Sequence, residues 1–542
     1  MRLFYKHLKR DFNVWVVYTL AITIFVAIPL FAVIIYTYSG VGEMWNHIVR
    51  YFLKDYILNS IFLLSGAGIL TFALGTSTAW VISNYNFPLC KLAEWLLFLP
   101  LAIPSYIMAY AYVGLFGNGG SIILLLKSVG INIHRIEMMN IAGLIWVLSF
   151  SLFPYVYAAA RAVFKSFPKE MRDTSNLLGA SKHRFFFSIA LPMASPAIIG
   201  GLFLVFMEVL NDYGAAKYYG INTFTTGIFR TWTALEDLQS AIFLSAILVL
   251  FLLVLTTVVK WYRGRKSYVF RLRFNSGFSN KTVLKGRKMI LYSSIIWSTL
   301  LFGLFLPLLQ LVKWGINTFD SVFEYNVWGI SAQSIGLALI SSALILIIAL
   351  ALVNFSKWNN FKVIKNISKS ATFGYILPGA IIGIGIIRSS QSIVDFAKDN
   401  FNLKIGYLFY SSSFVLVYAY IFRFMTIAYN LIDGGAQKIG KQLSESAYLL
   451  KISKLKSLFH IEIPLLKHAL IGSFLLVFID IMKELPLTLI LKPYNISTLA
   501  VKAYEYADDE RVAESAIPSL FLIAIISVLI IVVNYRERRK RP

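Results

Sequence analysis

Apolar stretches of about 20 residues recur along the whole chain, and short polar segments separate them. A stretch of this length lets one helix cross a hydrocarbon layer about 30 Å thick. Apolar–polar alternation over ten-residue segments, the signature of a membrane β-barrel, is absent from the sequence. Since helices are the other way to satisfy the backbone in lipid, the pattern predicts an all-α integral membrane protein. The stretches place about twelve transmembrane helices, near residues 14–36, 57–82, 93–116, 141–163, 194–212, 241–260, 289–311, 332–353, 370–387, 406–428, 466–490 and 514–534.

Composition and charge support the same class. Of the 542 residues, 58% are hydrophobic and 14% are charged, and this charged share is roughly half that of soluble proteins. The formal charge of +25 could indicate nucleic-acid binding. However, most Lys and Arg fall in segments that are cytoplasmic if the N-terminus is cytoplasmic, which is the positive-inside distribution. We therefore expect cytoplasmic N- and C-termini, contact with membrane lipid and no nucleic-acid partner.

The chain divides into two similar halves. Residues 261–288 contain nine Lys or Arg and no acidic residue. We predict one six-helix repeat over 1–260, a basic cytoplasmic linker over 261–288 and a second six-helix repeat over 289–542. Motifs recur in register between the halves, since Pro104 returns as Pro378 and Pro192 returns as Pro464 at nearly the same offset. An even number of helices per copy makes the tandem repeats parallel, and a pathway between such halves is typical of a transporter.

A patterned polar loop follows the fourth predicted span of each half. Its notable residues are Asp173, Leu177, Leu178, Gly179 and Ala180 in the first half, and Glu445, Ser446, Ala447, Leu449 and Leu450 in the second. Each loop predicts a short amphipathic helix, a turn and a second short helix that a proline stops. The leucine pairs form an apolar ridge on a cytoplasmic surface, and such a ridge is suited to a groove on another protein.

The spacing in these loops resembles the EAA motif of permease subunits in ATP-binding-cassette (ABC) importers. In the first loop an acid, two small residues, three further residues and a glycine precede Ile-x-Leu-Pro, and the second loop has a similar order at corresponding positions, ending in Ile-x-Ile-Pro. The first copy departs with Asp-Thr-Ser for Glu-Ala-Ala, and the second has Lys451 in place of the glycine. The resemblance implies a type I ABC importer permease fold, in which these loops are coupling helices that dock on the ATPase subunits.

Four carboxylates fall within or at the end of predicted spans. Glu208 and Asp212 in the first half superpose on Asp480 and Glu484 in the second, at the same offset that relates Pro192 to Pro464. The spacing i, i+4 predicts one helix face for each pair, and an acid near mid-bilayer costs about 2.5–3.5 kcal/mol. One interpretation is a substrate pathway of hard oxygen ligands for a cation, such as transient Fe³⁺. The alternative is local pairing, with Lys483 beside one pair and Asp212 at the outer interface.

The stretches around these acids, from Glu208 to Arg230 and from Asp480 to Leu489, resemble the fused permeases of ferric-iron importers. The likeness extends over essentially the whole chain. It implies a multi-pass protein of the bacterial inner membrane that forms the translocation pathway. It also implies two ATPase subunits, which use ATP and Mg²⁺, and a periplasmic or lipoprotein receptor for ferric ion.

We expect no catalytic residue and no cofactor in this chain. Residues 435–442 nearly fit a phosphate-binding loop, but Gln442 lacks the Mg²⁺-ligating hydroxyl and no strand precedes the stretch. Two other functions stay open: an ABC permease for thiamine or an inorganic anion, and, less favoured, a secondary transporter. A secondary transporter has no ATPase to dock, and the acids disfavour an anion.

Overall fold

The computed structural model describes residues 14–37, 40–131, 135–265, 281–323, 326–358, 368–369, 374–406, 413–439, 449 and 452–538. The described parts are helical apart from loops and one two-residue strand pair, which confirms the all-α prediction. Ten described helices are long and apolar enough to cross a membrane. Two shorter apolar helices, Val14–Pro29 and Ala516–Val532, lie where the first and last spans were predicted.

The elements of the first part of the chain precede the basic segment. They are α2 (Val14–Thr37), α3 (Trp45–Tyr51), α4 (Leu53–Asn84), β1 (Tyr85–Asn86), α5 (Cys90–Leu96), the 3₁₀ turn η1 (Leu99–Ala102), α6 (Ser105–Phe116), α7 (Ser121–Ser128), α8 (Ile141–Phe164), α9 (Lys169–Leu177), α10 (Lys182–Phe185), the π-helical turn η2 (Phe186–Ala190), α11 (Leu191–Asn211), α12 (Gly214–Tyr218), α13 (Phe224–Thr233) and α14 (Leu238–Arg265).

The remaining elements begin with β2, which lies inside the basic segment. They are β2 (Thr282–Val283), α15 (Gly286–Leu300), the π-helical turn η3 (Leu301–Phe305), α16 (Leu306–Asn317), α17 (Phe319–Phe323), α18 (Val327–Lys357), the 3₁₀ turn η4 (Gly374–Ile376), α20 (Gly379–Phe401), α22 (Phe414–Ile439), α24 (Lys454–Ser457), the π-helical turn η5 (Leu458–Glu462), α25 (Ile463–Met482), α26 (Pro486–Leu491), α27 (Leu499–Asp508) and α28 (Ala516–Arg538).

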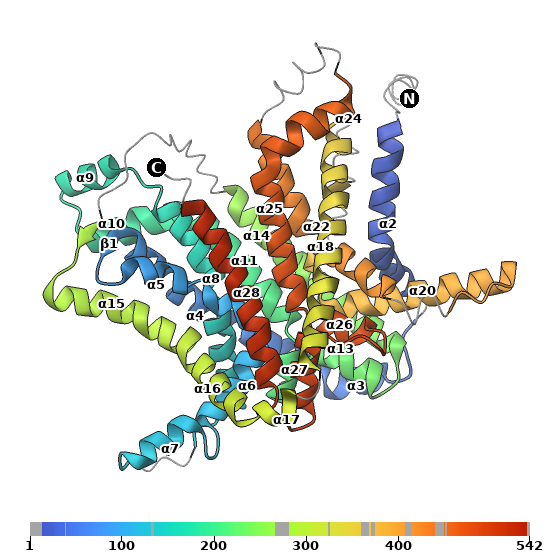
Figure 1. Ribbon diagram of the computed structural model, residues 1–542, viewed down its shortest axis with the longest axis horizontal. Coiled ribbons are helices and arrows are strands. Elements are labelled where there is room, and N and C mark those ends of the chain that lie inside the picture. Colours follow the sequence, from blue (N-terminus) through green and yellow to red (C-terminus); the bar gives the residue numbers. More distant parts are fainter. Residues whose placement is uncertain are drawn as a thin grey trace.

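The long helices form a bundle from which α7 and α20 project sideways (Figure 1). Helices α4, α8 and α11 pack on one another, and α18, α22 and α25 form a second group of three. Helix α2 packs against α18 of the second group and against α20. Helix α15 packs against α4 of the first group and against α5, and α16 packs against α6. The first long helix of each part thus contacts the other part, which joins the two groups into one buried core.

One end of the bundle carries several polar elements. Helix α2 begins there, α28 ends there, and α9, α10 and α24 lie at the same end, at the top of Figure 1. The parallel strands β1 and β2 join the segment after α4 to the second half of the basic segment, with Tyr85 opposite Thr282 and Asn86 opposite Val283. Helix α7 lies at the opposite end (Figure 1).

Three predicted spans are wrong as continuous helices. The stretch 466–490 is divided into α25, which ends at Met482, and α26, which begins at Pro486. The stretch 93–116 is divided into α5, η1 and α6, and the stretch 370–387 is interrupted before α20. Pro104 and Pro378 stand at the breaks with extended ψ angles of 147° and 146°. Proline lacks an N–H and clashes with a preceding helical turn, so a new helix begins directly after each proline.

Candidate functional site

The four predicted acids line one cavity. Glu208, Asp212, Asp480 and Glu484 surround a cavity of about 80 Å³, together with residues from α8, α22 and the two proline breaks. The acids do not form a cage, because no three His, Cys, Asp or Glu side chains of the described residues are placed to hold a metal ion. The cavity therefore presents carboxylates from both groups of helices to a shared space without a preformed metal centre.

The predicted single helix face for each acid pair is wrong in detail. Helix α11 ends at Asn211 and α25 ends at Met482, so Asp212 and Glu484 lie just beyond the helix ends. The backbone N–H of Ala216 donates to Asp212 Oδ1 at 3.0 Å, and that of Leu487 donates to Glu484 Oε1 at 3.1 Å. The short helices α12 and α26 thus fix both carboxylates in the cavity wall.

Threonines stabilise the two helix ends in the same way. Thr225 Oγ1 donates to the backbone carbonyl of Asp212 at 2.6 Å, and Thr488 Oγ1 donates to that of Glu484 at 2.8 Å. These carbonyls follow helix ends, where the helix no longer supplies every carbonyl with a backbone donor. The hydroxyls allow each chain to leave its helix inside the bundle without an unsatisfied buried carbonyl.

The proline breaks bring polar atoms to the cavity. Ser105, which follows Pro104, donates its hydroxyl to Asp212. Gly379, which follows Pro378, donates its backbone N–H to Asn211 Oδ1 at 3.0 Å. A Cβ on Gly379 would lie 2.7 Å from Arg423 Nη1 and 2.8 Å from Glu484 Oε1, so only glycine allows this close approach. Interrupted helices commonly build polar sites at membrane depth in this way.

Two cations complete the cavity. Arg423 of α22 pairs with Glu484 at 3.3 Å, and both side chains are about 5% exposed. Lys483 pairs with Asp480 at 3.2 Å. For Asp480, this is the local pairing that the sequence offered as the alternative to a substrate pathway. Asp212, in contrast, lines the cavity.

Sequence reasoning missed Arg423, although a charge inside the predicted span 406–428 was a signal by itself. It also missed Tyr375, whose hydroxyl donates to Glu208 Oε1 at 3.0 Å.

The first predicted docking loop forms the expected short helix, α9. Leu177 and Leu178 are 88% and 82% exposed, and Asp173 is also exposed. Gly179 has a φ of +75°, and the N–H of Ala180 reaches back to the carbonyl of Ser175 at 3.0 Å. This left-handed glycine ends the helix and leaves both leucines on the surface.

The second predicted loop is described only in part. Leu449 is 85% exposed. Glu445, Ser446, Ala447 and Leu450 lie outside the described residues.

Comparison with known proteins shows a similarity to a transport family. Residues 71–265 match the family described as binding-protein-dependent transport system inner membrane component. A similar protein along nearly the full length is the Fe(3+)-transport system permease protein FbpB 2 of Haemophilus influenzae, at 22% identity over 91% of this chain and 92% of the relative. Over residues 71–265, this chain is similar to the inner membrane permeases of binding-protein-dependent transport.

Other relatives of the permease differ in their named solute. The ferric transport system permease protein FbpB of Actinobacillus pleuropneumoniae is 21% identical over 94% of this chain and 76% of the relative. The sulfate transport system permease protein CysT of Salmonella typhimurium is 27% identical, but over only 29% of this chain and 55% of its own length. The family places the permease in the inner membrane as a multi-pass, non-catalytic subunit without a cofactor, together with ATPase and binding-protein partners.

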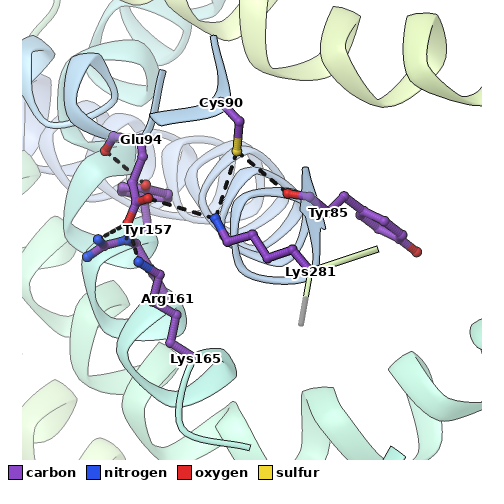
Figure 2. Close-up of polar contacts among 7 residues, drawn as sticks. All are labelled: Tyr85, Cys90, Glu94, Tyr157, Arg161, Lys165 and Lys281. Carbon is purple, nitrogen blue, oxygen red and sulfur yellow. Dashed lines mark hydrogen bonds and ion pairs between the residues drawn. The ribbon is translucent and has the colours of Figure 1, made fainter. Parts of the chain in front are cut away.

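A charge cluster ties the base of α9 to the permease core (Figure 2). Glu94 on α5 accepts hydrogen bonds from Arg161 and Lys165 at the end of α8, and Lys281 lies 3.9 Å from its second carboxylate oxygen. The hydroxyl of Tyr157 donates to the Glu94 carbonyl at 3.1 Å. Only four residues separate α8 from α9. The cluster therefore joins three segments: the stem of the docking loop, Lys281 in the basic segment, and α5, which leads through η1 to Pro104.

Glu94 is held in its charged form. Burial by itself would raise the pKa of this carboxyl, but the neighbouring Arg161 and Lys165 outweigh it and lower the pKa to about 2, from an ordinary value of 4.5. Because the folded-state pKa is depressed, the ion pairs stabilise the fold fully above about pH 4.5. This contribution is lost as the pH falls toward 2.

Replacing Glu94 with Gln is expected to lower the thermal stability of the purified permease at pH 7. The difference from the wild type should narrow as the pH falls from 5 to 3, since the stabilising carboxylate is then lost from the wild type as well. Scanning fluorimetry of both proteins across this range measures the effect. Glu137→Gln is the matched control, because its ion pair with Arg135 is more than half exposed and contributes little. A stability difference independent of pH would contradict the role given to this carboxylate.

Proposed function

We propose that this permease is the membrane subunit of an ATP-driven importer for ferric iron and forms the translocation pathway. The observation that carries the proposal is the cavity in which Glu208, Asp212, Asp480 and Glu484 meet. Carboxylate oxygens suit a hard cation, whereas soft metals prefer sulfur ligands. Two relatives that match more than nine-tenths of the chain are named as ferric permeases, which supports the same cargo.

The pathway is proposed to lie between two tandem six-helix repeats, over 1–260 and 289–542, joined by the cytoplasmic linker 261–288, with twelve spans in total. Corresponding elements at a fixed offset support this. The offset from the start of η2 to the start of η5 equals the offset from the start of α11 to the start of α25. Pro104 and Pro378, which have nearly the same backbone angles, are related by an offset only slightly longer.

Two ATPase subunits are the proposed partners at the end that carries α9, one on each docking loop. The ATP and Mg²⁺ chemistry belongs to these subunits. The exposed Leu177, Leu178 and Leu449 support this assignment, since an apolar ridge on a short helix fits a groove on a partner. This end is then cytoplasmic, as are both termini, which agrees with the start of α2 and the end of α28 on the same side (Figure 1). A periplasmic or lipoprotein receptor delivers ferric ion to the other side.

A second candidate cargo is an inorganic oxyanion. Arg423 and Lys483 in the cavity wall favour it, as does the partial match to a sulfate permease. Both cations are already paired with acids, however, so we place the oxyanion second.

The test is uptake by the complete complex of permease, ATPase and receptor in proteoliposomes. ATP-dependent accumulation of ⁵⁵Fe is expected, while labelled sulfate and thiamine should not accumulate. Uptake of sulfate or thiamine without iron would replace the proposed cargo while keeping the importer. Gradient-driven uptake without ATP would overturn the importer itself.

A further inference from the structure

The two acid pairs of the cavity differ in their charge partners. In the second half, both acids are ion-paired: Asp480 with Lys483 and Glu484 with Arg423. In the first half, neither Glu208 nor Asp212 forms an ion pair with any described residue. Lys483 and Arg423 lie beyond ion-pair distance of Glu208 and act on it only through their longer-range field. The cavity therefore has one wall of ion-paired acids and one wall of acids without an ion pair.

The asymmetry originates in two positions of the sequence. Lys483 and Arg423 stand at the positions that correspond to Asn211 and Ser151 in the first half, and all four side chains line the cavity. Asn211 uses its side-chain oxygen to accept from the backbone of Gly379, and Ser151 donates to the carbonyl of Ile103 at 3.2 Å. The first half thus has neutral side chains where the second half has its cations.

The partners of the first-half acids are neutral donors. Glu208 accepts from the hydroxyl of Tyr375, while Asp212 accepts from Ser105 and from the backbone of Ala216. Such hydrogen bonds orient a carboxylate and lower its cost of burial, but they leave its charge in place. Since an acid inside a membrane protein is expensive, two acids without an ion-paired cation of the chain indicate an external one.

We propose that the cation cargo binds to Glu208 and Asp212 of the first half, whereas Asp480 and Glu484 are neutralised internally and form the opposite wall. This inference rests on the proposed function. Hydroxyls of Tyr375 and Ser105, with water, complete the coordination of a hard cation. Two carboxylates instead of four bind it more weakly, which suits a site that must release its cargo.

The experiment measures ⁵⁵Fe uptake by the full complex in proteoliposomes with a small set of variants. Glu208→Gln removes one acid that has no ion pair. The double variant Asp480→Asn with Lys483→Asn removes one internal pair and keeps the net charge of the cavity. The double variant Glu208→Gln with Lys483→Asn also keeps the net charge but removes the proposed ligand. Glu208→Asp tests whether a shorter carboxylate retains part of the uptake, and co-purification with the ATPase reports on folding.

We expect Glu208→Gln to reduce the initial uptake rate at least tenfold, with or without Lys483→Asn. Removal of the internal pair should reduce it less than threefold, and Glu208→Asp should fall in between. Equal losses for Glu208→Gln and for removal of the pair would overturn the inference in favour of four equivalent acids. Recovery in the second double variant would overturn it in favour of net charge alone. Absence of iron uptake by the wild-type complex would refute the proposed function instead.

Discussion

Replacing Leu178 with Asp is expected to release one ATPase subunit from the purified complex and to abolish ATP-driven uptake. Leu178 is 82% exposed at the end of α9, beside the equally exposed Leu177. A carboxylate at the centre of an apolar contact must be buried without a partner. This costs on the order of 3 kcal/mol, or more than a hundredfold in affinity. The measurement is the ATPase-to-permease ratio after affinity purification.

Because two docking loops are proposed, the number of ATPase subunits retained by each variant can be predicted. Since the second loop is intact in Leu178→Asp, the ATPase-to-permease ratio should fall from two to about one. Adding Leu450→Asp should remove the ATPase entirely. Val129→Asp is the control: Val129 is 71% exposed and follows α7 at the opposite end of the bundle (Figure 1). Full ATPase content with both leucines replaced would contradict the docking assignment.

Apolar stretches predicted the long helices well. A helix in lipid must form its backbone hydrogen bonds internally, and it must carry apolar side chains along its whole length. Helices α4, α8, α11 and α18, for example, lie close to the predicted ranges. The breaks at Pro104 and Pro378 were missed, since the residues on both sides are as apolar as a continuous span. Both prolines stand at corresponding positions of the two halves and therefore support the repeat. Their effect on the backbone, rather than on hydropathy, is what interrupts the helices.

The candidate site was predicted in part. A carboxylate in an apolar stretch is conspicuous from sequence alone, so all four acids of the cavity were found. Their partners lie far away in sequence: Tyr375 is 167 residues from Glu208, and Arg423 lies on α22, whereas Glu484 follows the end of α25. Local spacing could suggest Lys483 for Asp480, three residues away. Only the packing of α22 against α25 brings Arg423 to Glu484.

Replacing Arg423 with Gln is expected to destabilise the permease strongly. Arg423 and Glu484 are both almost fully buried, and this ion pair is 3.3 Å long. Removing one partner leaves a buried carboxylate without a counter-charge, at a cost of about 3–5 kcal/mol. The N–H of Leu487 remains as a donor to Glu484, but one neutral hydrogen bond cannot replace the cation. The apparent melting temperature of the purified permease in detergent should fall by several degrees.

A double variant separates lost charge pairing from lost packing. Arg423→Gln with Glu484→Gln removes both charges, so no buried carboxylate is left unpaired, and most of the stability should return. Lys483→Gln is the matched comparison, because its pair with Asp480 is about 17% exposed and water can compensate part of the charge. It should cost clearly less than Arg423→Gln. If the double variant were as unstable as Arg423→Gln, the arginine would stabilise the helices by its packing, and Glu484 would not need it as a counter-charge.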